Sequence, residues 1–419
     1  MGFASAYLGS MTLASALVEE EPHTDTGIIL IVPSFDEPDI VSLLNSLVKC
    51  QQPGCKVEVL IGINAPPEAS ERQLEQNNLT IRDIESWRDA NMNAPFRLFF
   101  FDTGRSRDRG WGAGLARKIL MDEALRRFNI IDNPGGIIVS LDADCTVSSN
   151  YLTAIKDHFS AQPGINGASI RFEHVIPGSK DHPALRNAII SYELHMRYYY
   201  QALSYSGYPQ VFHTIGSALA ARASAYASVG GMNRRQAGED FYFIQKMIPL
   251  GGFIAINSAV VYPSARISDR VPFGTGPAVR AIIENPDQQL LTYNPQAFID
   301  LQRLVKRVPD FFDIGESQQG SIGDGLPAGI YDFLIANDWL KKVDEIRSNT
   351  ACRDSFIKRF YNWLNMFQLV KYLNFVHTGK YFEKMAVEDA SRQMIKMITG
   401  NDNCKDRYEL LEQYRMLER

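Results

Sequence analysis

A short apolar run ends in two acidic residues in the stretch GGIIVSLDAD, residues 135–144. The run is continuous rather than alternating and is rich in β-branched side chains, which is typical of a strand buried on both faces of a parallel sheet. Asp142 and Asp144 come where this strand ends. The stretch therefore predicts an internal strand whose carboxyl end carries two closely spaced carboxylates.

Similar apolar runs come before it, and each is followed by an amphipathic or polar segment long enough for a helix. This strand–helix alternation predicts βαβ units and a doubly wound α/β fold, with a mainly parallel sheet flanked by helices. Ligands bind such sheets outside the carboxyl ends of the strands. The expected strands are GIILIVP (27–33), VEVLIGIN (57–64) and FRLFFFD (96–102), and the expected helices span about 39–50, 67–93 and 112–128.

The chain of 419 residues is long enough for a large domain and a smaller one. We expect residues 1–26 to form an N-terminal arm with one short helix, and residues 27–276 to form the α/β domain. Residues 277–419 are expected to be mainly helical, because strand-like runs stop there. A Gly- and Ser-rich loop interrupts them at 316–329.

Composition narrows the classes of function. A net charge of −5 and a pI near 5.9 argue against non-specific binding to nucleic acid. The five cysteines are scattered without a CxxC pair, which disfavours a disulfide framework and a structural zinc site. The N-terminus lacks Lys or Arg before its apolar run, and no run reaches the roughly 18 residues of a membrane span. We expect a cytoplasmic protein.

The acidic triplet at Asp142 and Asp144 has two interpretations. Neighbouring carboxylates raise each other's pKa unless a cation or hydrogen-bond donors neutralise them. Mg²⁺ and Mn²⁺ take oxygen ligands and bridge to substrate phosphates, so the pair is suited to a metal-bound diphosphate. The alternative is a strand-end aspartate that caps the next helix, followed by a turn former. The triplet alone leaves both open.

Motifs along residues 27–270 occur in an order that resembles family 2 glycosyltransferases, enzymes of the GT-A fold. The first strand ends in PSFDEP, a Gly-rich turn RGWGAGLARK comes before the acidic strand, and Gly-Gly and Glu-Asp pairs follow it. The matching residues are Pro33, Phe35, Glu37, Gly112, Gly114, Ala116, Arg117, Asp142, Asp144, Gly230, Gly231, Glu239 and Asp240.

The resemblance implies that the protein binds a nucleotide-sugar donor, a UDP- or GDP-sugar, and that the earlier of these motifs contact it. It implies that Pro33, Ser34 and Glu37 line the nucleoside pocket. Asn64 stands where family members often carry a base-reading Asp, and its amide can both donate and accept. Arg117 is expected to reach the base or the phosphates, and Asp142 the ribose.

The resemblance also implies the chemistry. Asp144 would bind Mg²⁺ or Mn²⁺, Asp240 would be the general base of an inverting transfer, and Glu239 would orient the acceptor or the base. A helix N-terminus with acids that suit its dipole is the alternative for Glu239 and Asp240.

One segment departs from the family pattern. Many relatives place a metal-binding His near residues 262–270, and this sequence has none there. Arg266 and Arg270, followed by a Pro- and Gly-containing stretch, are interpreted as a lid that pairs with the donor diphosphate or an anionic acceptor, or else as a solvated loop.

The function expected from these residues is metal-dependent transfer of a hexosyl group from a nucleotide-sugar to an unidentified acceptor hydroxyl. A retaining transferase, a nucleotidyltransferase and a non-catalytic nucleotide-sugar binder are the alternatives. The sequence leaves a homo-oligomer open.

Overall fold

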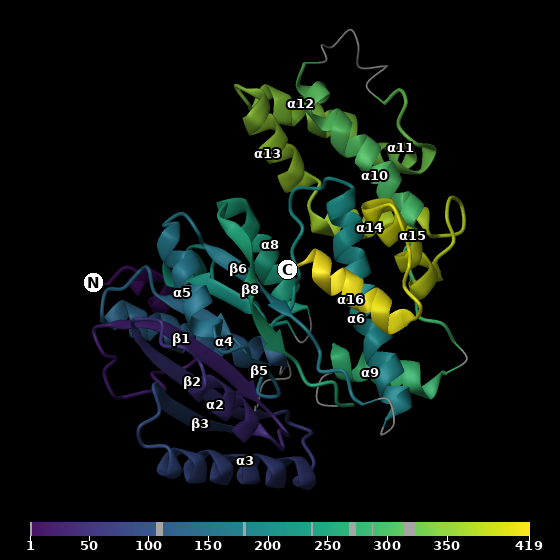
Figure 1. Ribbon diagram of the computed structural model, residues 1–419. Coiled ribbons are helices and arrows are strands. Elements are labelled where there is room, and N and C mark those ends of the chain that lie inside the picture. The colour runs from purple at the N-terminus through teal and green to yellow at the C-terminus, as the bar shows by residue number, and fades with distance from the viewer. Residues whose placement is uncertain are drawn as a thin grey trace. The chain divides into compact units, whose positions relative to one another are not determined.

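The computed structural model describes residues 2–105, 112–178, 182–235, 238–267, 274–286, 288–313 and 323–419. Their contacts divide the chain into two units. The sheet unit comprises Met1–Leu185, Phe212–Arg280 and Arg419, and the helical unit comprises Arg186–Val211 and Ala281–Glu418. Figure 1 labels the helices and strands of both units.

An eight-stranded mixed sheet forms the core of the sheet unit, in the order β3-β2-β1-β4-β7-β6-β8-β5. Strands β1 to β4 run parallel where they pair, β6 and β8 pair in parallel, and β7 is antiparallel to β4 and β6. The antiparallel β5 closes the order beside β8. The strands are β1 Thr26–Ser34, β2 Lys56–Ala65, β3 Arg97–Arg105, β4 Ile137–Ser140, β5 Thr146–Val147, β6 Gly167–Phe172, β7 Leu219–Arg222 and β8 Phe253–Tyr262.

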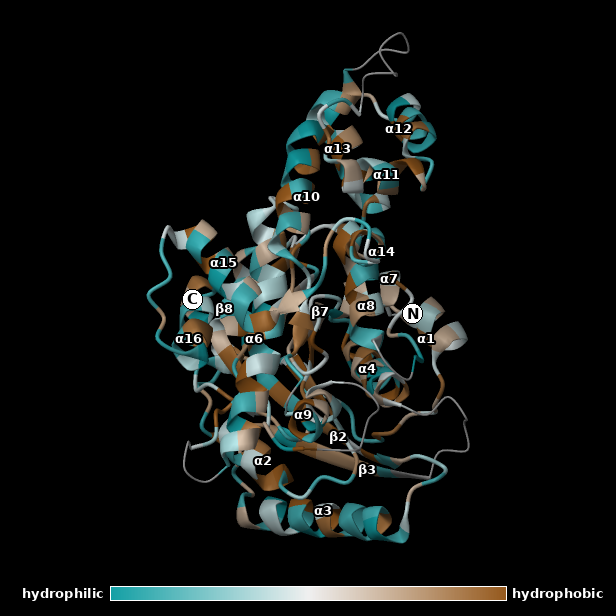
Figure 2. Cartoon of the chain, turned by 90° about the vertical axis from the view of Figure 1, so that its right-hand side faces the viewer, coloured by the Kyte–Doolittle hydropathy of each residue, from teal (hydrophilic) through white to brown (hydrophobic). Residues whose placement is uncertain are grey.

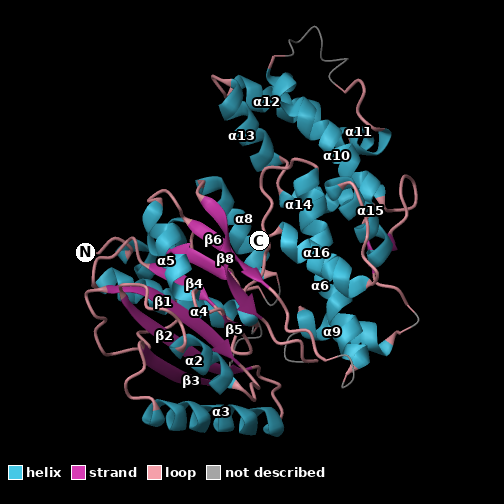
Figure 3. Ribbon diagram, in the orientation of Figure 1, coloured by secondary structure: helices cyan, strands magenta, loops and turns pink. Residues whose placement is uncertain are grey.

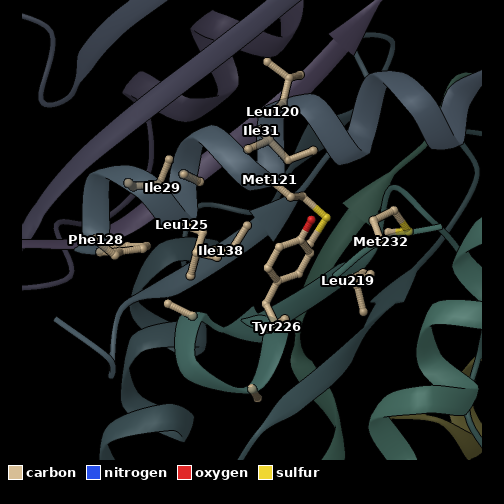
Figure 4. Close-up of a cluster of buried hydrophobic side chains, with 14 of the residues drawn as sticks. Ile29, Ile31, Leu120, Met121, Leu125, Phe128, Ile138, Leu219, Tyr226 and Met232 are labelled. Atoms are coloured by element: carbon tan, nitrogen blue, oxygen red, sulfur yellow. The ribbon is translucent and has the colours of Figure 1, made fainter. Parts of the chain in front are cut away.

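One face of this sheet is covered by four helices, which share a single hydrophobic cluster with it. Ile29 and Ile31 of β1 both face this cluster, as the two-residue repeat of a strand requires. Figure 4 shows Tyr226 pointing into the cluster beside Met121. The helices are α1 Ser5–Met11, α4 Ala113–Ile130, α7 Ala223–Ser228 and α8 Glu239–Met247.

The opposite face carries α2 Ile40–Val48, α3 Glu71–Ala90 and α5 Tyr151–Ala161. Helix α2 buries Ile40, Leu43, Leu44 and Leu47 at helical spacing. Helix α3 is mostly teal with a few brown segments in Figure 2, because only one of its faces is buried. A reciprocal bond pair between Ser70 and Gln73 fixes its first turn.

The predicted fold class is confirmed: the chain has an α/β fold with a mainly parallel sheet flanked by helices. Two details differ from expectation. Strand β4 ends at Ser140, because the backbone turns where the N–H of Cys145 donates to the carbonyl of Asp142 at 3.1 Å. Strand β8 was not expected, since the exposed Asn257 and Ser258 interrupt its apolar run.

The N-terminal segment is tied to α4 by buried polar groups. The hydroxyls of Tyr7 and Tyr226 both donate to Oδ1 of Asp122 at 2.7 Å, and Lys118 donates to Oδ2 at 2.9 Å. Burial and the Asp122 charge raise the pKa of Tyr7 well above its usual range, which keeps its proton in place as a donor.

Helices joined by loops make up most of the helical unit, as Figure 3 shows, and its described residues include a small two-stranded sheet in which β9 Leu291–Thr292 pairs with β10 Met385–Ala386. This pairing was not expected from a region without strand-like runs. The helices are α6 Pro183–Tyr205, α9 Thr275–Glu284, α10 Pro295–Arg307, α11 Ala328–Ile335, α12 Trp339–Ser348, α13 Arg353–Trp363, α14 Met366–Val376, α15 Val387–Thr399 and α16 Arg407–Leu417; α9 and the start of α6 cross the boundary between the units.

A buried charge network joins the first and last helices of this unit. Glu193 on α6 accepts two bonds from Arg415 on α16, at 2.7 and 2.8 Å, and a third from Arg197 at 2.8 Å. Arg197 also donates to Glu418. Among the described residues, no helix is long and apolar enough to cross a membrane.

Candidate active site

The carboxyl edge of the sheet gathers the residues that the sequence singled out. Because β1, β2 and β4 are parallel neighbours, Ser34, Asn64 and Asp142 all come to this edge. The strand order reverses between β1 and β4, which is where ligands bind in sheets of this kind. Strand β7 runs the other way, so the segment that precedes it, with Gly216, also lies at this edge.

Arg117 on α4 connects the two acidic motifs, which are about a hundred residues apart in sequence. Its Nη2 donates to Oδ1 of Asp142 at 2.6 Å, and its Nη1 donates to Oε1 of Glu239. The Arg117 side chain is 7% exposed and that of Glu239 is 4% exposed, whereas Asp142 is 37% exposed. One guanidinium therefore fixes a carboxylate at the open edge to a buried carboxylate on α8.

Two glycines make room for this arrangement. A Cβ at Gly216 would lie 2.5 Å from Nη1 and 2.6 Å from Nη2 of Arg117. A Cβ at Gly114 would lie 2.9 Å from Cβ of Glu239 and 2.9 Å from the carbonyl oxygen of Asn233. All four distances are below ordinary van der Waals separation, so any residue other than glycine at either position would have to displace its neighbours.

Replacing Gly216 by alanine tests the first of these contacts. The Arg117 end group is bonded to two carboxylates and would have to give up this position, so we expect Gly216→Ala to cost about 1–3 kcal/mol. The matched control is Gly164→Ala, because a Cβ at Gly164 meets nothing within 4 Å. The measurement is thermal unfolding followed by circular dichroism. Equal melting temperatures for the two variants would contradict the close packing at Gly216.

The two carboxylates at the start of α8, those of the buried Glu239 and the half-buried Asp240, have perturbed pKa values. Burial raises the pKa of Glu239 and of Asp240, and the neighbouring carboxylates raise both further. Arg117 lowers both, without cancelling the rise. Backbone N–H groups of Phe241 and Gly216 also donate to Asp240, the first at 2.7 Å. Asp240 is thus held in place by donors while its affinity for a proton is increased.

Burial alone would lower the pKa of Arg117, but the charges of Asp142, Glu239 and Asp240 together raise it above its usual value. The guanidinium is therefore charged at every accessible pH. Its Nε is buried without a hydrogen-bond partner among the described residues.

A second guanidinium, that of Arg266, lies near the ends of β1 and β4. Arg266 donates to both carboxylate oxygens of Glu37, to Oε1 at 2.9 Å. Its Nη2 also lies 3.6 Å from Oδ2 of Asp144, whose side chain is 20% exposed. Glu37 is fully buried, and its Oε1 accepts the N–H of Asp39 at 2.9 Å. Glu37 thus acts on the edge through Arg266, which it holds against Asp144.

The turn after β1 is fixed by an amide that sequence reasoning did not single out. Asn77 on α3 accepts the N–H of Asp36 at 2.9 Å and donates to the carbonyl of Asn64 at 3.0 Å. Asp36 has a left-handed backbone, with φ of 51°. Asn77 ties the ends of β1 and β2 together, so Pro33, Ser34 and Asn64 share one rim. Only the tertiary structure identifies it, because a polar residue in a polar helix carries no signal.

Two hydroxyls at this rim are buried without a hydrogen-bond partner among the described residues, those of Ser34 and Ser140. Unpaired buried hydroxyls are costly, and a bound ligand can satisfy one that faces the edge.

Histidines also reach this edge from places the sequence did not indicate. His174 and His213 both pack edge-on against Phe172, the last residue of β6, at 5.7 and 5.0 Å between ring centroids. His174 is within 3.2 Å of the Thr275 hydroxyl. Arg270, predicted to bind the donor, lies outside the described residues, as does most of the expected lid.

The described residues contain no group of three or more His, Cys, Asp or Glu side chains placed to hold a metal ion. They do offer Asp142 and Asp144, both partly exposed, at one strand end. Mg²⁺ is commonly held by one or two carboxylates together with substrate phosphates and water. The donor set fits a metal that arrives with a diphosphate, rather than one held by the protein alone.

No protein-family model matches the sequence, and no curated protein matches it. Among solved structures, the chain is similar to S. aureus TarS 1-349 in complex with UDP-GlcNAc, at 14% identity over 81% of this chain and 92% of that one, with a TM-score of 0.39. It is also similar to the mannosyltransferase PcManGT from Pyrobaculum calidifontis in complex with GDP-Man and Mn²⁺, at 14% identity over 86% and 92%, with a TM-score of 0.33. At these values, what those proteins bind does not transfer to this chain.

Proposed function

We propose that this chain is an inverting glycosyltransferase of the GT-A fold, which moves a sugar from a nucleotide-diphosphate donor to an acceptor hydroxyl. The observation that carries the proposal is the Arg117 bridge between Asp142 and Glu239. It joins two acidic pairs. The pair at the strand end is suited to a metal-bound diphosphate, and the pair at the start of α8 is suited to proton transfer.

On the donor side, Ser34 and Asn64 supply hydrogen-bonding groups for the nucleoside at the ends of β1 and β2. Asp144, with Asp142 beside it, would hold Mg²⁺ or Mn²⁺. When bound, this ion stabilises the negative charge of the departing nucleoside diphosphate. Arg266, held by Glu37 beside Asp144, lies where a guanidinium can pair with the same phosphates.

On the acceptor side, Asp240 is the general base. Its carboxylate takes the proton of the acceptor hydroxyl while that oxygen bonds to the anomeric carbon and the bond to the diphosphate breaks. The raised pKa makes it a stronger base than an exposed aspartate, and the N–H groups of Phe241 and Gly216 fix its direction. Glu239 and Arg117 position it. A cytoplasmic location and the transfer of a hexosyl group stay predictions.

A thermal-shift series tests the donor half of this proposal. We expect UDP or GDP with Mn²⁺ to raise the melting temperature by several degrees, since a ligand at about 100 times its Kd contributes about 2.7 kcal/mol. The shift should be much smaller when either nucleotide is added to the wild type without Mn²⁺. It should also be much smaller when UDP or GDP is added with Mn²⁺ to Asp144→Ala. The matched control is Asp157→Ala, an exposed aspartate on α5.

Two results would contradict the proposal. One is a wild-type protein that no nucleoside diphosphate stabilises. The other is an Asp144→Ala variant that responds to UDP or GDP with Mn²⁺ as strongly as Asp157→Ala does.

A further inference from the structure

The helical unit contains a pocket of about 440 Å³ that the transfer reaction does not use. It is lined by residues of α12, α13 and the start of α14. Its volume lies in the lower part of the range of about 300–1,000 Å³ that is usual for small-molecule sites. Its lining is unusually polar for such a site, with four side-chain amides and one indole.

Trp363 supplies the aromatic surface of this pocket. It is the last residue of α13, is half-buried, and packs edge-on against the fully buried Phe360 with ring centroids 5.4 Å apart. Phe360 therefore supports the indole from one side. A partly exposed aromatic face of this kind is suited to packing against the apolar C–H face of a flat ligand.

The amides around Trp363 have unused hydrogen-bonding capacity. Oε1 of Gln368 is buried and has no hydrogen-bond partner among the described residues. Asn349 donates one N–H to the carbonyl of Glu345 at 2.8 Å, and no bond to its side-chain oxygen is formed within the described residues, so this oxygen can accept one. A buried acceptor without a donor is costly, so Gln368 favours a ligand that brings hydroxyl groups.

The charges in the pocket add one further preference. Lys342 donates to both carboxylate oxygens of Glu345 at 2.8 Å, so these two charges compensate each other. Arg359 is exposed on α13, and no ion pair to it is formed within the described residues. The pocket therefore has a positive excess at one side, which favours an anionic substituent.

We propose that this pocket is a carbohydrate-binding subsite that holds one or two sugar rings of a glycan. A sugar ring stacks its C–H face on Trp363, and its hydroxyls donate to Gln368 and Asn349. An acidic ring places its carboxylate toward Arg359. The site lies within the helical unit, so the proposal does not depend on the chemistry assigned to the sheet unit.

Saturation-transfer NMR on the full chain, with no nucleotide added, tests this. The probes are maltohexaose as a neutral glycan and hexagalacturonate as an acidic one. We expect binding in the millimolar range, tighter for hexagalacturonate. Trp363→Ala should weaken it at least tenfold, and Gln368→Ala about fivefold. Tyr331→Ala is the matched control, because Tyr331 is an exposed aromatic of the same unit outside this pocket.

The proposal is overturned if neither glycan transfers saturation at 10 mM, roughly the weakest binding that the expected range allows. It is also overturned if Trp363→Ala binds as tightly as Tyr331→Ala, or if inorganic phosphate occupies the pocket and both glycans stay silent. Folding of each variant is checked by its melting temperature. Loss of nucleotide binding in the thermal-shift series would refute the transferase proposal and leave this result unaffected.

Discussion

Asp240→Asn is expected to lower the rate of sugar transfer by about 10²–10⁴-fold while donor binding stays within a few-fold of wild type. The amide keeps the shape of the side chain but cannot take the acceptor's proton. It also keeps an oxygen that can accept the N–H of Phe241, now at 2.7 Å from the carboxylate. The start of α8 should therefore stay in place.

The stability of this variant provides a second readout. Because folding raises the pKa of Asp240, the folded state binds the proton more tightly than the unfolded state does, and ionisation at neutral pH costs stability. An uncharged amide removes that cost. We expect a melting temperature equal to or above that of wild type at pH 7, so lost transfer could not be attributed to unfolding.

The wild-type pH profile depends on the same carboxylate. Transfer requires ionised Asp240, so the rate should fall as the pH drops through its raised pKa, above the value of about 3.9 for an exposed aspartate. The measurement is nucleoside-diphosphate release from a panel of UDP- and GDP-sugars. Asp89→Asn, at a side chain 79% exposed, is the control. Unchanged transfer in Asp240→Asn would rule out Asp240 as the base.

Arg117→Met is expected to be the most destabilising single change at the site. Methionine occupies much of the space of the arginine side chain but has no charge. Glu239, whose side chain is 4% exposed, would therefore lose the guanidinium that neutralises it. Removing one partner of a buried ion pair costs about 3–5 kcal/mol, because the other charge is left uncompensated. The melting temperature of the sheet unit should fall by about 10 °C.

Two further variants show whether the lost stability comes from the uncompensated charge of Glu239 or would follow from replacing any arginine. Arg88→Met removes a half-exposed arginine whose ion pair with Asp89 is 3.9 Å long, and it should cost no more than about 1 kcal/mol. The double variant Arg117→Met/Glu239→Gln removes the uncompensated charge and should recover part of the lost stability. Differential scanning calorimetry measures all of them. If Arg117→Met melts like Arg88→Met, the buried bridge does not hold the site together.

Local sequence was sufficient for the fold class and for the approximate positions of the first four strands. A continuous β-branched run such as 27–33 specifies a buried strand because every side chain on both faces must be apolar. The acids after 137–140 and the amide of Asn64 follow from the same reasoning, since parallel strands present their carboxyl ends at one edge. Where apolar runs were broken, as in β8 with its exposed Asn257, the pattern failed.

Which side chains meet at that edge was decided only by the tertiary structure. Arg117 appeared as one arginine of a Gly-rich motif, and its bond to Glu239, 122 residues away, depends on how α4 and α8 pack on one face of the sheet. Glu37 and Arg266, 229 residues apart, are a second case. Ion pairing at long sequence separation leaves no periodic trace, because it depends on the path of the backbone between the partners. The sequence therefore determined the acids at the strand end, and the packing of α4 and α8 decided that Asp142 shares its guanidinium with Glu239.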